Sequence, residues 1–342
     1  MNQNAKIYVA GHRGLVGSAI VRQLEKHGYT NIIMRTHSEL DLLNQHDVVD
    51  FFEVEKPDYV FLAAAKVGGI LANNTYRGQF IYENLMIQSN IMHQSMVHGV
   101  KRLVFLGSSC IYPKMAPQPI KEEYLLTGPL EPTNSPYAVA KIAGIEMCDA
   151  YNKQYGTSFV PVMPTNLYGP GDNFDLEKSH VLPALMRKFH LAKLAMDGNW
   201  EAIDIDEALW GNIPKDIKTA IGYSLRGVGD CKVVLWGSGS PFREFLYVDD
   251  MANACSHVMF NSDTIELLNI GTGRDITIFD MAKVVAEVVG YEGDIIWDQS
   301  KPDGTPRKLL DVDKMNENGW KSTIALRDGL MRMYLWYQNK GK

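Results

Sequence analysis

The sequence predicts an α/β protein with a doubly wound parallel sheet and a second, smaller α/β domain. Short runs rich in β-branched and aromatic residues recur through the first half of the chain, and longer amphipathic segments separate them. The strand-like runs are KIYVAG, TNIIMRT, DYVFLAAA, RLVFLGS and SFVPVMP. Strands that alternate with helices form right-handed βαβ units, which place helices on both faces of a parallel sheet.

The helices of this first half are expected at residues 19–28, 46–55, 84–99 and 135–156, where apolar side chains recur every three or four positions. After about Tyr168 the alternation gives way to helical periodicity, an acidic stretch and the strand-like run KVVLWG. We therefore predict a nucleotide-binding domain over residues 1–170, completed by a returning segment at about 243–272. Residues 171–242 and 273–342 are expected to form the smaller substrate-binding domain.

The composition is that of an ordinary globular protein. Hydrophobic residues make up 46% and charged residues 22% of the chain, and the net charge is −6, so neither nucleic acid nor a membrane is expected as a partner. The four cysteines lack the spacing of a zinc site or a disulfide framework, and we expect no bound metal. The N-terminus has no signal-peptide pattern, which together with the scattered cysteines predicts a cytoplasmic protein.

A glycine-rich turn follows the first predicted strand. It reads GHRGLVG, with Gly11, Gly14 and Gly17, and it leads directly into a helix. Glycines at this junction let the backbone approach a pyrophosphate, whose charge is met by the N-terminus of the helix. Three glycines also occur in ordinary strand-helix turns. Their place after the first strand favours a dinucleotide site and therefore a Rossmann domain.

The end of the second predicted strand indicates which dinucleotide binds. NAD-binding proteins usually carry an acidic residue there, which holds the ribose hydroxyls. This chain has Arg35 instead, and Arg13 lies within the glycine turn. Two guanidinium groups suit the 2′-phosphate of NADP(H), which is the cofactor we expect. The alternative is that both arginines are solvated surface charges.

Tyr137 and Lys141 are four residues apart on a predicted helix, so they share one helical face. A pair with this spacing is expected about once by chance in such a chain, and its context is therefore what matters. Ser108 lies at the end of the fourth predicted strand, just before this helix. A tyrosine whose pKa is lowered by a neighbouring ammonium can exchange a proton with a substrate oxygen that a serine also holds. These residues predict hydride transfer at a carbonyl or carbinol carbon.

Together these features resemble the extended short-chain dehydrogenase/reductase superfamily. Within it, the chain resembles the GDP-L-fucose synthase family through AGHRGLVGSAI, LAAAKVGGI, LGSSCIYPK, EPTNSPYAVAKIAGI, VMPTNLYGP, SHVLPALMR, WGSGSPFREFLYVDDMA and KPDGTPRKLLDV. The resemblance runs from about Lys6 to Trp336, apart from one interior segment. It implies NADPH-dependent 3,5-epimerisation and 4-reduction of GDP-4-keto-6-deoxy-D-mannose to GDP-L-fucose.

The resemblance also implies the roles of five catalytic residues. Ser108, Tyr137 and Lys141 match the reductase triad of the family, and Cys110 and His180 match its epimerase acid/base pair. A ketone at C4 acidifies the protons on C3 and C5, so a thiolate can remove a proton that an imidazolium returns from the opposite face. Considered without the resemblance, a structural role is the more frequent one for both residues: Cys110 as a small core residue and His180 as a helix-capping or packing group.

Further binding residues follow from the same resemblance. The implied cofactor contacts are Gly11, His12, Arg13, Gly14, Leu15, Val16, Gly17, Arg35, Asp41, Leu42, Ala63, Ala64, Ala65, Gly107, Tyr137, Lys141, Pro164, Thr165, Asn166, Leu167 and His180. The implied GDP-sugar contacts are Ser108, Ser109, Cys110, Asn166, Lys188, Trp236, Arg243 and Asp303. The family also implies a homodimer built through the helices around residues 84–98 and 137–155.

The chain departs from the family pattern at two places. Lys188 stands where the family commonly has arginine, which keeps the charge and loses the forked geometry. An acidic insert occupies about residues 195–230 and is either a lid that selects the sugar or a surface and oligomer-packing elaboration. We favour the second interpretation, because acidic side chains repel an anionic GDP-sugar.

Three other functions stay open at this level. The substrate could be a related GDP-4-keto sugar, such as a 3,6-dideoxyhexose or a 6-deoxyheptose, which is epimerised and reduced or only reduced. The chain could instead be a non-catalytic NADP sensor, although such proteins tend to lose the tyrosine or the lysine. It could also be an epimerase that retains NAD, which Arg35 argues against.

Overall fold

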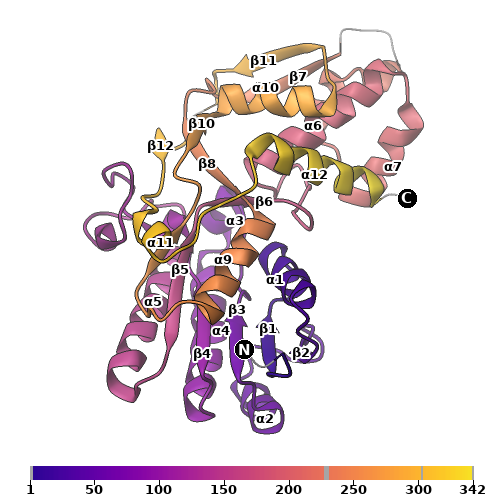
Figure 1. Cartoon of the computed structure of the whole chain (residues 1–342). Coiled ribbons are helices and arrows are strands. Elements are labelled where there is room, and N and C mark those ends of the chain that lie inside the picture. The colour runs from indigo at the N-terminus through magenta and orange to yellow at the C-terminus, as the bar shows by residue number, and fades with distance from the viewer. Residues whose placement is uncertain (1–2, 227–230, 302, 341–342) are drawn as a thin grey trace. The chain divides into compact units, whose positions relative to one another are not determined.

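The structure is a computed structural model that describes residues 3–226, 231–301 and 303–340 (Figure 1). The chain packs into two compact units. Unit 1 contains residues 1–167, 245–273 and 309–323, and unit 2 contains residues 168–244, 274–308 and 324–342. Strands β6 (Asn166–Tyr168) and β8 (Phe242–Tyr247) carry the chain out of unit 1 and back into it. The insert predicted at 195–230 belongs to unit 2, and its last four residues, 227–230, lie outside the described residues.

One segment differs from the predicted division of the chain. Residues 309–323 were assigned to the second domain with the rest of 273–342, but they pack in unit 1. Ile120 donates a backbone hydrogen bond to Leu309 (2.8 Å) and accepts one from Asp311 (2.8 Å). Farther along, the Thr323 backbone and hydroxyl donate to Asp250, each at 2.9 Å. Such brief pairing between distant segments leaves no periodic signal in a sequence.

Unit 1 is built on a parallel sheet with the strand order β2-β1-β3-β4-β5-β9. Figure 1 labels β1 to β5 of this sheet. The strands are β1 (Ile7–Ala10), β2 (Ile32–Ile33), β3 (Tyr59–Leu62), β4 (Arg102–Leu106), β5 (Phe159–Pro164) and β9 (Leu268–Ile270). The chain leaves β1 toward β2 and returns to β3 on the other side of β1. In a parallel sheet this topological switch point marks the crevice where ligands bind.

Side chains of unit 1 alternate between two apolar cores, one on each face of the sheet. In β1, Ile7 and Val9 belong to one core and Tyr8 and Ala10 to the other. This alternation follows from the two-residue period of a strand. The helices that supply the cores are α1 (Leu15–Lys26), α2 (Gln45–Glu55), α3 (Ile70–Thr75), α4 (Arg77–Val97), α5 (Ser135–Tyr155), α9 (Val248–Phe260) and α11 (Asp313–Glu317). The doubly wound α/β fold is thereby confirmed. Short 3-10 turns lie at η1 (Ser109–Ile111) and η2 (Glu122–Tyr124).

Unit 2 combines helices with short strands. Strand β7 (Lys232–Trp236) pairs in parallel with β11 (Asp294–Asp298), while the first residues of β8 pair with β10 (Asp275–Thr277) and β12 (Arg307–Lys308). The helices are α6 (Val181–Met196), α7 (Trp200–Trp210), α8 (Lys215–Ala220), α10 (Ile278–Val289) and α12 (Leu326–Asn339), with a 3-10 turn η3 (Tyr223–Leu225). Among the described residues of both units, no helix is long and apolar enough to cross a membrane.

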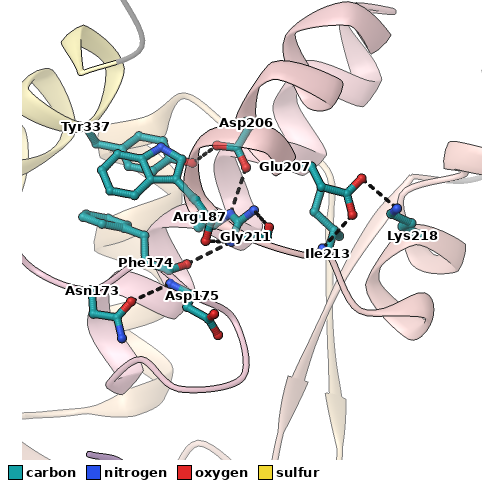
Figure 2. A network of polar contacts seen from close by, with 11 residues as sticks. Asn173, Phe174, Asp175, Arg187, Asp206, Glu207, Gly211, Ile213, Lys218 and Tyr337 are labelled. Atoms are coloured by element: carbon teal, nitrogen blue, oxygen red, sulfur yellow. Dashed lines mark hydrogen bonds and ion pairs between the residues drawn. The ribbon is translucent and has the colours of Figure 1, made fainter. Parts of the chain in front are cut away.

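The insert is anchored to unit 2 through a buried arginine (Figure 2). The Arg187 side chain on α6 is inaccessible to solvent, and its Nε donates to Asp206 Oδ1 on α7 at 2.8 Å. Tyr337 of α12 donates to the other oxygen of Asp206. The remaining guanidinium nitrogens donate to the backbone carbonyls of Phe174, Trp210 and Gly211, at 2.6–3.1 Å. A second link, from Lys218 to Glu207 at 2.8 Å, ties α8 to α7. The insert is thus a packed part of unit 2.

We predict that Arg187→Met lowers the free energy of unfolding by about 3–5 kcal/mol, because Asp206 would remain buried without its cation. Chemical denaturation measures this change. The matched control is Lys193→Met on the same helix, which removes an exposed ion pair with Asp197 and should change stability by less than about 1 kcal/mol. Equal effects of the two substitutions would contradict the anchoring role of Arg187.

Candidate active site

The glycine turn packs against the end of β3 at the switch point of the sheet. Gly11 has a φ of +84°, and a side-chain carbon there would lie 2.7 Å from the backbone nitrogen of Ala64. A side-chain carbon on Gly17 would overlap the carbonyl oxygen of Gly11. Gly14 donates its N–H to that same carbonyl at 3.0 Å. Only glycine fits at positions 11 and 17, so the turn has the form that close backbone approach to a phosphate requires.

Two features make this turn suitable for a pyrophosphate. Helix α1 begins at Leu15, its N-cap Gly14 supplies no side-chain cap, and the first N–H groups of a helix have no intrahelical acceptor. Leu15 and Val16 therefore present backbone donors at the positive end of the helix dipole. His12 Nδ1 is buried and has no hydrogen-bond partner among the described residues. Burial lowers the pKa of this imidazole, so the ring stays neutral at pH 7 and one ring nitrogen is a donor.

The predicted 2′-phosphate site contains acidic as well as basic groups. Arg35 Nη2 donates to Glu55 Oε1 at 2.5 Å, and Nη1 donates to the Met34 carbonyl at 2.8 Å. Hydrogen bonds from Thr36 and, to a smaller extent, the charges of Arg35 and Arg13 lower the pKa of Glu39. Both arginines are therefore close enough to act on one anion. A phosphate bound here would share Arg35 with Glu55.

The other predicted cofactor residues lie along the carboxyl ends of the strands. Ala63, Ala64 and Ala65 follow β3, and Gly107 follows β4 and donates its N–H to Val162 at 2.8 Å. Pro164 ends β5, and Thr165 donates its N–H to the Ile270 carbonyl at 3.0 Å. Asn166 and Leu167 continue into β6. Asp41 and Leu42 lie in the loop before α2, where Leu42 accepts a hydrogen bond from Asn90 at 2.9 Å. Residues 41–42 and 63–65 are all partly buried.

Ser108 and Cys110 lie side by side after β4. Ser108 Oγ and Cys110 Sγ are 3.1 Å apart, and the Cys110 N–H donates to Ser108 Oγ at 3.4 Å. The Ser108 N–H donates to Met163 Sδ at 3.2 Å, which fixes the serine to β5. Both side chains are partly accessible, whereas Ser109 between them is buried. The turn η1 thus directs a hydroxyl and a thiol toward one place.

Tyr137 is on the first turn of α5, and it interacts with this pair. Burial and, to a smaller extent, Cys110 raise the pKa of the phenol, while a hydrogen bond with Ser108 lowers it. The expectation that Lys141 lowers the pKa of Tyr137 is wrong for this structure. Lys141 Nζ donates to the Leu106 carbonyl at 2.8 Å and lies 4.6 Å from the centroid of the Phe105 ring. The phenol is accordingly protonated at neutral pH, the form in which it can donate a proton.

Burial lowers the pKa of Lys141 from 10.5 to about 8. Because this depression disfavours the ammonium in the folded state, the cost is fully present below pH 8 and disappears as pH rises to about 10.5. We therefore predict that Lys141→Met raises the free energy of unfolding at pH 7 by roughly 3 kcal/mol, and that this gain vanishes near pH 10.5. Chemical denaturation across this pH range measures it. Lys153→Met, which replaces an exposed lysine on the same helix, is the control and should change little. A Lys141→Met protein that is less stable than wild type at pH 7 would contradict the prediction.

His180 belongs to unit 2, where it is the N-cap residue of α6. Loss of hydration and, secondarily, the charge of Lys308 lower the pKa of its imidazole. At neutral pH the ring is therefore mainly neutral, and the imidazolium expected from the sequence is not its resting form. A neutral imidazole accepts a proton before it can return one. Its role in proton transfer remains a prediction.

Two of the predicted substrate residues of unit 2, Lys188 and the exposed Trp236, lie close together. Trp236 on β7 is 62% exposed, and the ammonium groups of Lys301 and Lys188 lie 5.3 Å and 6.0 Å from a ring centroid of its indole. Lys188 also donates to the Val234 carbonyl at 3.2 Å. Burial lowers the pKa of Lys188, and Asp216 on α8 of the insert opposes this effect. A cationic aromatic surface of this kind suits a nucleoside diphosphate. The insert borders it.

Two other predicted substrate residues have contacts within unit 2. Arg243 Nη1 donates to the carbonyl of the preceding residue at 2.7 Å, and its Nη2 lies beside Gly304, where a side-chain carbon would come within 3.0 Å of it. Asp303 accepts hydrogen bonds from the Ser238 N–H (2.9 Å) and hydroxyl (2.6 Å), so its carboxylate holds the turn after β7. These bonds give Asp303 a structural role whether or not it contacts a sugar.

Sequence reasoning missed one residue next to the reactive groups. Asn134 immediately precedes α5, and its Nδ2 donates to the Cys110 carbonyl at 3.1 Å. It stands within the motif EPTNSPYAVAK, where an asparagine before a helix suggests only a cap. A sequence cannot show that the side chain turns away from the helix.

Known proteins share both the sequence and the fold of this chain. Residues 7–271 match the model of the NAD dependent epimerase/dehydratase family. The chain is 56% identical over 337 residues to "Putative GDP-L-fucose synthase 2" of Arabidopsis thaliana, a match that covers 98% of this chain and 93% of that protein. It is 51% identical over 341 residues to "GDP-L-fucose synthase" of Escherichia coli strain K12, which covers 97% and 96% of the two chains.

A solved structure is also similar over its full length. It is described as a GDP-mannoheptose C4 reductase from Campylobacter jejuni with NADP bound. This chain is 44% identical to it with a TM-score of 0.85, and the match covers 99% of this chain and 100% of that one.

Proposed function

The chain belongs to the NAD dependent epimerase/dehydratase family, and on that basis we propose that it converts GDP-4-keto-6-deoxy-D-mannose to GDP-L-fucose with NADPH. The protein is thus an NADP-dependent oxidoreductase that also epimerises its substrate. The identity to GDP-L-fucose synthases over nearly the whole chain supports the substrate, and the NADP-bound relative supports the cofactor.

One observation carries the proposal: Cys110 Sγ lies 3.1 Å from Ser108 Oγ. Reduction of a ketone needs a hydroxyl and a phenol at the carbonyl oxygen, which Ser108 and Tyr137 supply. It does not need a thiol. A thiol next to these donors is placed to exchange protons at the carbons beside the carbonyl, whose C–H bonds the ketone acidifies. The pair therefore supports epimerisation and reduction in one site.

We assign each step of the reaction to particular residues. Hydrogen bonds from Ser108 and Tyr137 to O4 stabilise the enolate that forms when a proton leaves C3 or C5. Cys110 and His180 remove and return these protons on opposite faces, so that each carbon inverts. Tyr137 then gives its proton to O4. When bound, NADPH supplies the hydride that reduces C4. Leu15, Val16 and His12 would hold its pyrophosphate, and Arg13 and Arg35 its 2′-phosphate.

A second candidate is a related GDP-4-keto sugar. The similarity to a GDP-mannoheptose C4 reductase favours a heptose as this alternative, with the same residues acting in reduction alone. The insert lies beside Trp236 and Lys188, and its residue Asp216 is close enough to act on the Lys188 ammonium. We therefore propose that the insert contributes to the choice between the two sugars.

The proposal is tested by incubating the enzyme with GDP-4-keto-6-deoxy-D-mannose and NADPH and by identifying the product sugar by NMR. GDP-L-fucose supports it. A 6-deoxyhexose that is reduced at C4 but retains the D configuration at C5 would show a reductase without epimerisation. No oxidation of NADPH with this substrate, but rapid oxidation with a GDP-4-keto-heptose, would establish the alternative.

Cofactor preference provides another prediction. Arg35→Ala removes a charge-assisted bond worth about 1.5–3 kcal/mol, so KM for NADPH should rise by roughly 10–100-fold. KM for NADH, which lacks the 2′-phosphate, should change little. Steady-state kinetics with both cofactors measure this. Arg22→Ala is the control, since Arg22 is on α1 and pairs with Asp249 at 2.8 Å. An unchanged NADPH preference in Arg35→Ala would assign the phosphate to other groups.

We also propose that the protein is a cytoplasmic homodimer. Helices α4 and α5 pack together and expose the large side chains Tyr82, Val97, Val139 and Tyr155. A shallow depression lined by Arg77, Ile81, Pro136 and Val139 lies between the two helices. A paired-helix face of this kind fits a two-fold interface.

Among the described residues the four cysteines form no disulfide, which fits a reducing compartment.

A further inference from the structure

Asn134 occupies a helix-capping position without capping the helix. It is the N-cap residue of α5, yet its side chain accepts no hydrogen bond from the first turn. The carboxylate of Glu131 accepts from the backbone N–H groups of Thr133 (2.9 Å) and Asn134 (3.3 Å), which precede the first helical residue, so it does not cap the first turn either. An asparagine in this place usually stabilises the helix through its own oxygen. Here the Asn134 side-chain amide makes no capping bond and is available for a contact outside the helix.

The amide is directed at the reactive turn. Asn134 Nδ2 donates to the backbone carbonyl of Cys110 at 3.1 Å. Its Oδ1 is buried and has no hydrogen-bond partner in the described part of the chain. Cys110 is the middle residue of η1, so a bond to its carbonyl fixes the peptide plane from which the thiol projects. Within the described residues, Asn134 is the side chain that donates to this carbonyl.

The groups needed for reduction are fixed by other contacts. The Ser108 N–H is bound to Met163, and Lys141 is bound to the carbonyl of Leu106. Tyr137, in the first turn of α5, is itself buried. None of these contacts passes through the Asn134 amide. Its loss would therefore disturb the thiol more than the hydroxyl, the phenol or the ammonium.

We infer that Asn134 is a positioning residue for epimerisation, which orients Cys110 relative to the helix that carries Tyr137 and Lys141. The inference rests on the proposed function. Small displacements of a reacting group cost large factors in rate, about 100-fold for 1 Å. A reaction that needs the thiol should thus respond to Asn134, and a reaction that needs only the reductase groups should not.

The test is Asn134→Ser. Serine keeps a good N-cap group but cannot reach the Cys110 carbonyl. In D2O, with GDP-4-keto-6-deoxy-D-mannose and NADPH, deuterium incorporation at C3 and C5 per NADPH oxidised should fall by at least about tenfold. Reduction of the ketone that has already been epimerised should stay within about threefold of wild type. This split between two half-reactions would not arise from a general loss of structure.

The matched control is Asn152→Ser on the same helix. Asn152 Nδ2 donates to the Phe159 carbonyl at 2.8 Å, far along α5 from Cys110, so this change should alter stability but not the ratio of epimerisation to reduction. If Asn134→Ser does not fold, Asn134→Asp keeps the size and the capping preference and removes the same donor. A variant at 134 with the wild-type ratio overturns the inference. A wild-type enzyme that incorporates no deuterium overturns the proposed function instead.

Discussion

Replacing Cys110 with serine is expected to lower the rate of epimerisation by at least about 100-fold, the lower end of what a positioned acid or base contributes. Serine is nearly the same size as cysteine, but its hydroxyl forms an anion far less readily than a thiol does. The neighbouring Ser108 and the buried Tyr137 and Lys141 are untouched. Reduction of an epimerised ketone should therefore remain within a few-fold of the wild-type rate.

The measurement compares deuterium exchange at C3 and C5 with NADPH oxidation in the same sample. Cys231→Ser is the matched control, since this partly buried thiol of unit 2 donates to the Ala192 carbonyl at 3.3 Å and a serine can replace it. Full epimerisation by the Cys110→Ser protein would remove the thiol from the mechanism. Loss of both half-reactions would instead mean that Cys110 supports the reductase groups.

Tyr137→Phe should have the largest effect on reduction. In the proposed mechanism the phenol donates a proton to O4, and removing a positioned general acid costs about 10²–10⁴ in rate. Burial raises the pKa of this phenol, so the wild-type group is in the donating form throughout the neutral range. KM for NADPH should change much less than kcat. Exchange at C3 and C5 should fall less than reduction does, because Ser108 still holds the enolate oxygen.

Single-turnover oxidation of NADPH provides the rate for this variant. Tyr151→Phe serves as a control on the same helix, where the hydroxyl lies 3.1 Å from His93 Nδ1 on α4. The control should keep the wild-type rate. Reduction by Tyr137→Phe within tenfold of wild type would show that another group protonates O4.

The sheet of unit 1 was predictable because its strands are short buried runs and its helices are amphipathic. Helix α4 was predicted from residue 84 but begins at Arg77, since the segment before Asn84 has no clear apolar period. Residues 309–323 were misplaced, because they join unit 1 through backbone bonds and scattered side chains. Pairing of this kind depends on the folded chain and has no local pattern.

The sequence also predicts which residues are reactive, and those roles stay predictions, but it could not predict the electrostatics of these residues. The motifs name Ser108, Tyr137 and Lys141. Whether an ammonium lowers the pKa of a phenol depends on where it is directed, and Lys141 is bound to the Leu106 carbonyl. Likewise Arg35 was predicted from its strand position, while its ion pair with Glu55 depends on where the last residue of α2 lies in the folded chain. The role inferred for Asn134 depends on the direction of one amide.

The central claim is that one site both inverts C3 and C5 and reduces C4. The most direct measurement is one turnover of GDP-4-keto-6-deoxy-D-mannose with NADPH in D2O, followed by NMR and mass spectrometry of the product. We predict GDP-L-fucose with deuterium at C3 and C5 and protium at C4, since the hydride comes from NADPH. A reduced sugar that carries no deuterium at C3 and C5 would contradict the account and leave a 4-reductase.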